Sequence, residues 1–114
     1  MKQFFTILGI VAAATAYAQN DTDRVYIPDT NFKKELLFNT SIDTNKDRAI
    51  SYGEARAYKG KIDVSYKQIK DLTGIEAFVN ITELYCYNNQ LTSLDVSKNT
   101  ALTSLGCSSN QLTS

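Results

Sequence analysis

The sequence ITELYCYNNQL at residues 81–91 returns as LTSLGCSSNQL at residues 102–112. The aliphatic and cysteine positions of the first copy hold the same kinds of residue in the second, after a shift of 21 residues. A weaker copy precedes both, because the apolar positions of residues 62–72 match those of residues 84–94 after a shift of 22 residues. This period indicates about three turns of one coil, in which no turn can bury its apolar side without a neighbour.

The spacing inside each copy indicates a short strand. Leu84 and Cys86 are two positions apart, so their side chains point to one side of an extended chain. Tyr85 and Tyr87 then point to the other side. Later apolar residues, such as Leu91, would return along the far side of the coil. The sequence therefore predicts an α/β solenoid, a short stack of coils with parallel strands and an N-terminal helical cap.

The spacing L-x-x-L-x-C-x-x-N-x-L resembles the leucine-rich repeat, and the connector LTSLDVSKNTA at residues 91–101 is similar to the repeats of exported bacterial leucine-rich proteins. The resemblance covers about residues 60–114, with the last coil incomplete. It implies that Asn89 and Asn110 hydrogen-bond backbone groups of adjacent coils. Lys67 stands at that position in the first copy, and an ammonium group cannot replace a buried amide. We therefore expect the first coil to be degenerate and more open.

The first eighteen residues have the pattern of a secretory signal peptide. Lys2 supplies a positive charge, an uncharged apolar run covers residues 4–15, and Ala16 and Ala18 precede Gln19. The run is shorter than the roughly 20 residues that span a bilayer, so a membrane anchor is the less favoured alternative. We expect cleavage before Gln19, no membrane span afterwards, and secretion to the periplasm, the cell surface or the medium.

Two cysteines, Cys86 and Cys107, occupy equivalent positions of adjacent copies. An even number of cysteines in an exported protein permits a disulfide. However, side chains that stack in register on neighbouring parallel strands have poor geometry for that bond, whereas small apolar thiols suit a packed interior. We therefore expect two buried free thiols.

The composition disfavours catalysis and the binding of nucleic acid. The 114 residues include 12 Lys plus Arg and 12 Asp plus Glu, for a formal net charge of +0. A neutral chain has no summed field that would attract nucleic acid or an anionic membrane. Histidine is absent, which removes the commonest general acid or base and every nucleophile–histidine pair. We expect no enzymatic activity.

The segment before the repeats is predicted to form a helical cap over the first coil, whose apolar residues have no preceding coil to cover them. Asp29 is a suitable N-cap for a helix that extends to about Phe38, and a second helical stretch is expected at residues 54–58. The apolar stripe of the first helix comprises Phe32, Leu36 and Leu37. The predicted organisation is a signal peptide (1–18), a disordered tail (19–25), the cap (26–59) and the repeats (60–114).

The loop at residues 43–54 has the spacing of a calcium-binding loop. Oxygen-bearing side chains stand at its positions 1, 3, 5, 9 and 12, with an apolar residue at position 8, which resembles an EF-hand or dockerin loop. The resemblance implies a backbone carbonyl ligand from Ala49 and side-chain ligands from Asp43, Asn45, Asp47, Ser51 (directly or through water) and Glu54.

Two features weaken the case for a tightly bound ion. Arg48 holds the sixth loop position, where glycine is usual because the chain adopts a positive φ, and a side chain there costs about 1–2 kcal/mol. In addition, Ser51 and Glu54 have the spacing of a capping box for the second helix, and residues 43–47 have ordinary turn composition. Ca²⁺ is therefore a possible and weak ligand, and no other cofactor is expected.

The outward strand positions are the expected partner-binding surface, because solenoids generally bind through the concave side of their strands. Tyrosines there can bury a large area at low entropic cost; the alternative is that they serve only as strand-forming residues. The positions are Asp63, Ser65, Glu83, Tyr85, Tyr87, Ser104, Gly106 and Ser108.

These features predict a secreted, non-catalytic leucine-rich repeat module that binds an unidentified protein through its concave strand face. The alternative is a calcium-dependent docking or cell-envelope assembly element that uses residues 43–54. A third possibility is an accessory segment of a larger enzyme. The last copy stops within its turn at Ser114, so we expect either a fragment of a longer repeat protein or a bare C-terminal coil that self-associates.

Overall fold

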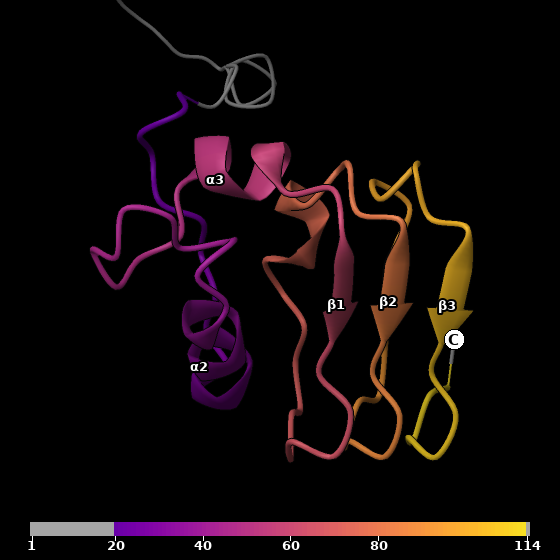
Figure 1. The fold of residues 1–114 in the computed structure, drawn as a ribbon. Coiled ribbons are helices and arrows are strands. Elements are labelled where there is room, and N and C mark those ends of the chain that lie inside the picture. Colours follow the sequence, from indigo (N-terminus) through magenta and orange to yellow (C-terminus); the bar gives the residue numbers. More distant parts are fainter. Residues whose placement is uncertain (1–19, 114) are drawn as a thin grey trace, which may run out of the picture.

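The computed structural model describes residues 20–113 (Figure 1). The predicted signal peptide falls on residues 1–18 and lies outside the described residues. Among the residues that are described, no helix has the length and apolar character needed to cross a membrane. Their elements are, in chain order, α2 (Thr30–Phe38), α3 (Tyr52–Ala57), β1 (Lys61–Asp63), the 3-10 helix η1 (Ile75–Ala77), β2 (Glu83–Tyr85) and β3 (Ser104–Gly106).

The three strands form one parallel sheet in the order β1-β2-β3, with one coil of chain per strand. Figure 1 shows the coils side by side, with the three strands running in the same direction and the chain turning back after each strand. We call them the β1 coil (residues 60–80), the β2 coil (81–101) and the β3 coil (102–113). Ile62 pairs with Leu84, and Leu84 pairs with Leu105, so the predicted register is confirmed.

The interior of the stack holds the residues that the period placed there, together with a set that it missed. Leu84, Cys86 and Leu91 are completely buried. Ile81, the first apolar position of the second copy, is equally buried. Phe78 is also completely buried at the end of η1, and the period cannot identify it because it lies on an irregular segment between two strands.

Asparagine side chains join neighbouring coils at the ends of β2 and β3, as the sequence predicts. The Asn89 carbonyl oxygen accepts hydrogen bonds from the N–H groups of Lys67 and Ile69, both 3.0 Å away in the β1 coil. Its amide nitrogen donates to the carbonyl oxygens of Val64 and Cys86. Asn110 repeats the arrangement one coil later, accepting from Leu91 N–H and donating to the Cys86 and Cys107 carbonyls.

The same sharp corner follows each strand. Tyr66, Asn88 and Ser109, which are equivalent under the repeat, have φ values of 62°, 56° and 59°. The β1 coil therefore keeps the corner of the later coils, although Lys67 replaces the asparagine. The Lys67 ammonium lies 3.6 Å from the Glu35 carboxylate of α2.

Helix α2 covers the open side of the β1 coil. Asp29 caps it as predicted, because one carboxylate oxygen accepts from the N–H groups of Asn31 and Phe32. The other oxygen accepts from the N–H groups of Lys70 and Asp71, in the β1 coil. Asp29 thus joins the cap to the first coil, and the side chains of Phe32, Leu36, Ile42 and Ile62 are buried in one shared core.

Helix α3 begins earlier than the sequence predicts, at Tyr52 rather than at residue 54. Ser51 is its N-cap, and both hydrogen bonds of the predicted capping box are present between Ser51 and Glu54. Glu54 is therefore the third residue of the helix, because a capping box places its acidic residue at that position.

The expectation of a disordered tail is wrong for residues 20–25. Val25 N–H donates to the Ile50 carbonyl at 2.8 Å, and Tyr52 N–H donates to the Asp23 carbonyl at 2.9 Å. Val25 is also buried in the core. Backbone pairing with residues 50–53 orders this segment, and polar composition alone does not reveal such a partner.

Candidate functional site

The predicted partner-binding residues lie along one side of the sheet, which we call the outer sheet face. Asp63, Tyr85 and Gly106 are paired across the three strands, as are Lys61, Glu83 and Ser104. In β1 and β2 these side chains alternate with buried ones, so this side faces away from the core, whereas in β3 Gly106 is itself buried. The face comprises Asp63, Ser65, Glu83, Tyr85, Tyr87, Ser104, Gly106 and Ser108.

Two tyrosines form the centre of the outer sheet face. The rings of Tyr85 and Tyr87 are stacked, with centroids 6.0 Å apart and an interplanar angle of 7°. Both residues are half-buried, so each keeps surface for a partner. The pair is therefore a flat aromatic patch fixed by its own stacking.

Gly106 makes room for one of these rings. A Cβ atom at position 106 would lie only 2.1 Å from the Tyr87 hydroxyl oxygen, far inside van der Waals contact. The Tyr87 side chain therefore lies across β3, and any larger residue at 106 would displace it.

Hydrogen bonds to neighbouring side chains fix Tyr85 and the start of the face. The Tyr85 hydroxyl donates to a Glu83 carboxylate oxygen at 2.8 Å, and this bond raises the pKa of Tyr85 above its ordinary value. Ser65 Oγ accepts from Tyr87 N–H at 3.0 Å, and an Asp63 oxygen accepts from Ser65 N–H at 3.1 Å. Ser104 is half-buried, whereas Ser108 is exposed.

The predicted calcium loop brings three of its acidic residues together. Carboxylate oxygens of Asp43, Asp47 and Glu54 all lie within 4.8 Å of one another. Asn45 and Ala49 also take part in the loop's own hydrogen bonds. Asp47 N–H donates to Asn45 Oδ1, and Ala49 N–H donates to Asp47 Oδ1, each at 3.1 Å.

Asp43 provides a buried, unpartnered oxygen to this cluster. The residue is only 5% exposed, and its Oδ1 atom has no hydrogen-bond partner within the described chain. Its Oδ2 atom accepts from Arg48 N–H at 3.2 Å. A buried carboxylate oxygen without a partner is costly, and a bound cation would satisfy it.

Glu54 fits a metal less well, because hydrogen bonds occupy both of its oxygens. Oε1 accepts from Ser51 N–H and Ser51 Oγ, at 3.0 and 3.2 Å. Oε2 accepts from Thr44 N–H at 3.0 Å and from Asn45 N–H at 3.4 Å. A bidentate metal contact would have to displace or share these bonds.

Arg48 adopts the strained conformation that its loop position demands. Its φ is 65°, and Lys46 two residues earlier has a φ of 58°. The chain thus turns through the left-handed region without a glycine at the sixth position, as the sequence predicts.

The two cysteines stack in adjacent coils and remain free. Cys86 is completely buried, and this burial raises its pKa to about 11. Cys107 is only half-buried, so the expectation of two buried thiols holds for Cys86 alone. The reason is that no further coil covers Cys107 in the described chain.

No family model matches the sequence. The chain is 36% identical over 95 residues to internalin J of Listeria monocytogenes serotype 4b (strain F2365), which covers 83% of this chain and 10% of that protein. The chain therefore spans about a tenth of the length of this relative.

Solved structures of internalins have a similar fold. A structure of the functional domain of InlJ from Listeria monocytogenes, described as including a cysteine ladder, superimposes with a TM-score of 0.61 at 29% identity and covers 85% of this chain and 21% of that one. The internalin inlF of Listeria monocytogenes str. 4b F2365 gives a TM-score of 0.66 at 21% identity, covering 87% and 28%. The CBM51-2 and INT domains of Clostridium perfringens ZmpB give 0.57 at 24% identity, covering 82% and 19%.

These likenesses agree with the parallel sheet, the period near 21 residues and the asparagines that join the coils. The described chain therefore has a leucine-rich repeat fold similar to that of bacterial internalins.

Proposed function

We propose that the chain is an exported, non-catalytic module that binds a protein partner through its outer sheet face. The observation that carries the proposal is the stacked pair Tyr85 and Tyr87, held over Gly106 on a repeat fold similar to internalins. Tyrosines fixed in this way offer a large contact area at little entropic cost. A binding role also agrees with the absence of histidine from the sequence.

The test is affinity capture from the producing organism with covalent cross-linking and mass spectrometry. Wild type is compared with Tyr85→Ala/Tyr87→Ala and with Tyr26→Ala, a control that removes an exposed tyrosine outside the outer sheet face. We expect a protein that is retained by wild type and by the control but lost with the double variant. A protein retained equally by all three would show that binding does not use the outer sheet face. Circular dichroism checks that each variant is folded.

Export itself is tested by the mass of the protein recovered outside the cytoplasm. Cleavage at the predicted site would give a chain that begins at Gln19. Recovery of the protein only in the cytoplasm would contradict export.

A second candidate function is calcium-dependent docking or envelope assembly through residues 43–54. The unpartnered Asp43 oxygen beside Asp47 and Glu54 favours it. Side-chain oxygens would hold the ion from Asp43, Asn45, Asp47 and Ser51, and Ala49 would add its backbone carbonyl. The Glu54 carboxylate would bind the ion while its oxygens also accept their present hydrogen bonds. Bound calcium would supply charge neutralisation and rigidity. The competing bonds of Glu54 and the charge of Arg48 favour weak affinity, on the order of 10⁻⁴ to 10⁻³ M.

Isothermal titration with calcium chloride, together with thermal melting in calcium and in chelator, tests this candidate. We expect a rise in melting temperature with calcium, its loss in Asp43→Asn and its retention in Asp95→Asn, which changes an exposed aspartate in the β2 coil. A melting temperature that is the same in chelator and in calcium would reject the candidate.

The exposed edge of the β3 coil supports a further proposal, self-association of the mature chain. Leu105 is 44% exposed, whereas its partner Leu84 is fully buried. Light scattering should show concentration-dependent association that Leu105→Lys weakens. A monomer at high concentration would contradict it.

A further inference from the structure

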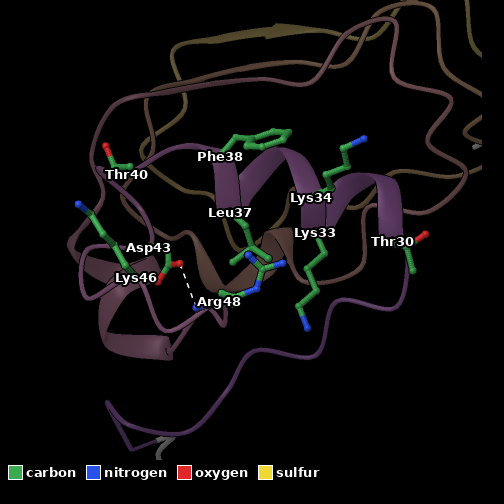
Figure 2. A pocket seen from close by; sticks show the side chains of 9 residues that line it. All are labelled: Thr30, Lys33, Lys34, Leu37, Phe38, Thr40, Asp43, Lys46 and Arg48. Atoms are coloured by element: carbon green, nitrogen blue, oxygen red, sulfur yellow. Dashed lines mark hydrogen bonds between the residues drawn. The ribbon is translucent and has the colours of Figure 1, made fainter.

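A groove lies between helix α2 and the loop that follows it, away from the outer sheet face. Residues 30, 33, 34, 37 and 38 recur at helical spacing, so they share the side of α2 opposite to buried Phe32 and Leu36. Together with Thr40, Asp43, Lys46 and Arg48 they line an open cavity of about 560 Å³ (Figure 2).

Cationic side chains line this groove from both sides. Lys33 and Lys34 come from α2, and Lys46 and Arg48 come from the loop (Figure 2). Within residues 20–113, none of the four forms an ion pair. The molecule is neutral overall, so this concentration of four unpaired positive charges is a local feature.

The groove also presents apolar surface. Leu37 is half-buried beneath it, and Phe38 is 70% exposed at its edge. The Lys34 ammonium lies 6.0 Å from the centre of the Phe38 ring. An exposed phenylalanine beside cations is suited to a ligand that carries both negative charge and an apolar group.

One acidic residue contributes to the lining without cancelling this charge. Asp43 is buried, with 5% of its surface exposed, and one of its carboxylate oxygens accepts a hydrogen bond from Arg48 N–H. The accessible charges of the groove are therefore those of the lysines and the arginine.

We propose that this groove binds an acidic polypeptide segment that carries an apolar side chain. Acidic side chains pair with the cations on the two sides, and the apolar side chain packs against Leu37 and Phe38. The nine residues of α2 make the groove about 13 Å long, which accommodates roughly four residues of extended chain. The groove is open along the surface, and this shape favours a chain segment over an enclosed small molecule.

The test is a fluorescence anisotropy titration with the mature protein in chelator, so that the result is independent of calcium. The probe is a fluorescein-labelled peptide with Glu-Glu-Phe-Glu-Glu at its centre. In two matched peptides, glutamine replaces every glutamate or serine replaces the phenylalanine. We expect binding of the first peptide at low salt, weakening at high salt, and about tenfold weaker binding of the glutamine peptide.

Protein variants locate the site. Lys33→Glu/Lys46→Glu should weaken binding about tenfold, whereas Lys59→Glu/Lys98→Glu, the same charge change at exposed positions elsewhere, should change it less than about twofold. Phe38→Ser should weaken binding of the phenylalanine peptide and leave the weaker serine peptide unaffected. Because the Phe38 side chain is exposed, Phe38→Ser should leave the protein folded.

Four results would overturn the proposal. The first is equal affinity for the glutamate and glutamine peptides. The second is equal loss in the two lysine variants, which would indicate a general charge effect. The third is binding to vesicles that contain anionic lipid without binding to the acidic peptide, which would make the groove a membrane contact. Loss of binding in the outer-face variant Tyr85→Ala/Tyr87→Ala would also overturn it, because the two surfaces are separate.

Discussion

The β2 coil and the β3 coil share the repeat pattern, and they differ in how completely they are buried. Leu84 is 0% exposed and its partner Leu105 is 44% exposed, although both are leucines at the same strand position. The β2 coil has a neighbour on each side, whereas the β3 coil has one in the described chain. Burial in this fold is therefore set by position in the stack rather than by residue type.

The β1 coil extends the comparison, because it is buried without a preceding coil. Ile62, Val64 and Ile69 are buried against α2 and the segment around Ile42. The Asp29 carboxylate accepts hydrogen bonds from the N–H groups of Lys70 and Asp71, which takes the place of the hydrogen bonds from an adjacent coil. A helical cap thus serves as a neighbour in packing and in hydrogen bonding.

The largest expected effect is the difference between two leucine truncations. Leu84→Ala should lower the free energy of unfolding by about 3–4 kcal/mol, because it leaves a cavity in a fully packed core. Leu105→Ala should cost about 1 kcal/mol or less, because that side chain is already partly in water. Urea denaturation of the mature chain measures both. Equal losses would mean that the β3 coil is covered in solution, for example by a second copy.

The asparagines test the same contrast through hydrogen bonds. Asn89→Ala leaves buried groups of two coils unpaired and should cost about 2–3 kcal/mol. Asn110 is only half-buried, so water can replace part of its contacts and Asn110→Ala should cost about 1 kcal/mol. Urea denaturation again provides the measurement. A larger loss at Asn110 than at Asn89 would contradict the dependence on stacking position.

The repeat itself could be predicted from the sequence, because each coil must show the same apolar positions to its neighbours. Leu84, Cys86 and Asn89 therefore occur at fixed spacing, and the structure pairs them as that spacing requires. The capping residues Asp29 and Ser51 were also predictable, because helix capping depends on the local sequence.

Non-local contacts explain what the sequence did not reveal. The pairing of residues 20–25 with residues 50–53 joins segments without any repeated pattern. The burial of Phe78 depends on an irregular segment. The cationic groove was missed because Lys33 and Lys46 lie on separate segments, and only the fold brings them to one cavity.

A smaller effect tests the contact between the β2 and β3 coils on the outer sheet face. Gly106→Ala places a Cβ atom against the Tyr87 hydroxyl and should cost about 1–2 kcal/mol. In the Tyr87→Ala background the same change should be nearly neutral, because the obstructing ring is gone. A double-mutant cycle by urea denaturation measures this coupling. Equal costs in both backgrounds would show that the ring does not rest on Gly106 in solution.

The smallest effect concerns the two thiols, which repeat the contrast between a buried coil and an open one. Burial raises the pKa of Cys86 to about 11, whereas a thiol in the unfolded chain ionises near pH 8.5.

Between these values the folded chain binds more protons than the unfolded chain, so the contribution of Cys86 to stability is full below about pH 8.5 and is lost as pH rises toward 11. Cys86→Ala should therefore flatten the decline of stability over this range, and Cys107→Ala should leave it close to wild type. Wild type and the two variants have the same tyrosines and lysines, so the effect of those groups on the pH dependence cancels when the three proteins are compared. In the folded protein at pH 8, a thiol reagent should modify Cys107 and spare Cys86 until the chain unfolds. Equal labelling of both cysteines would mean that the interior of the β2 coil opens as readily as the exposed edge.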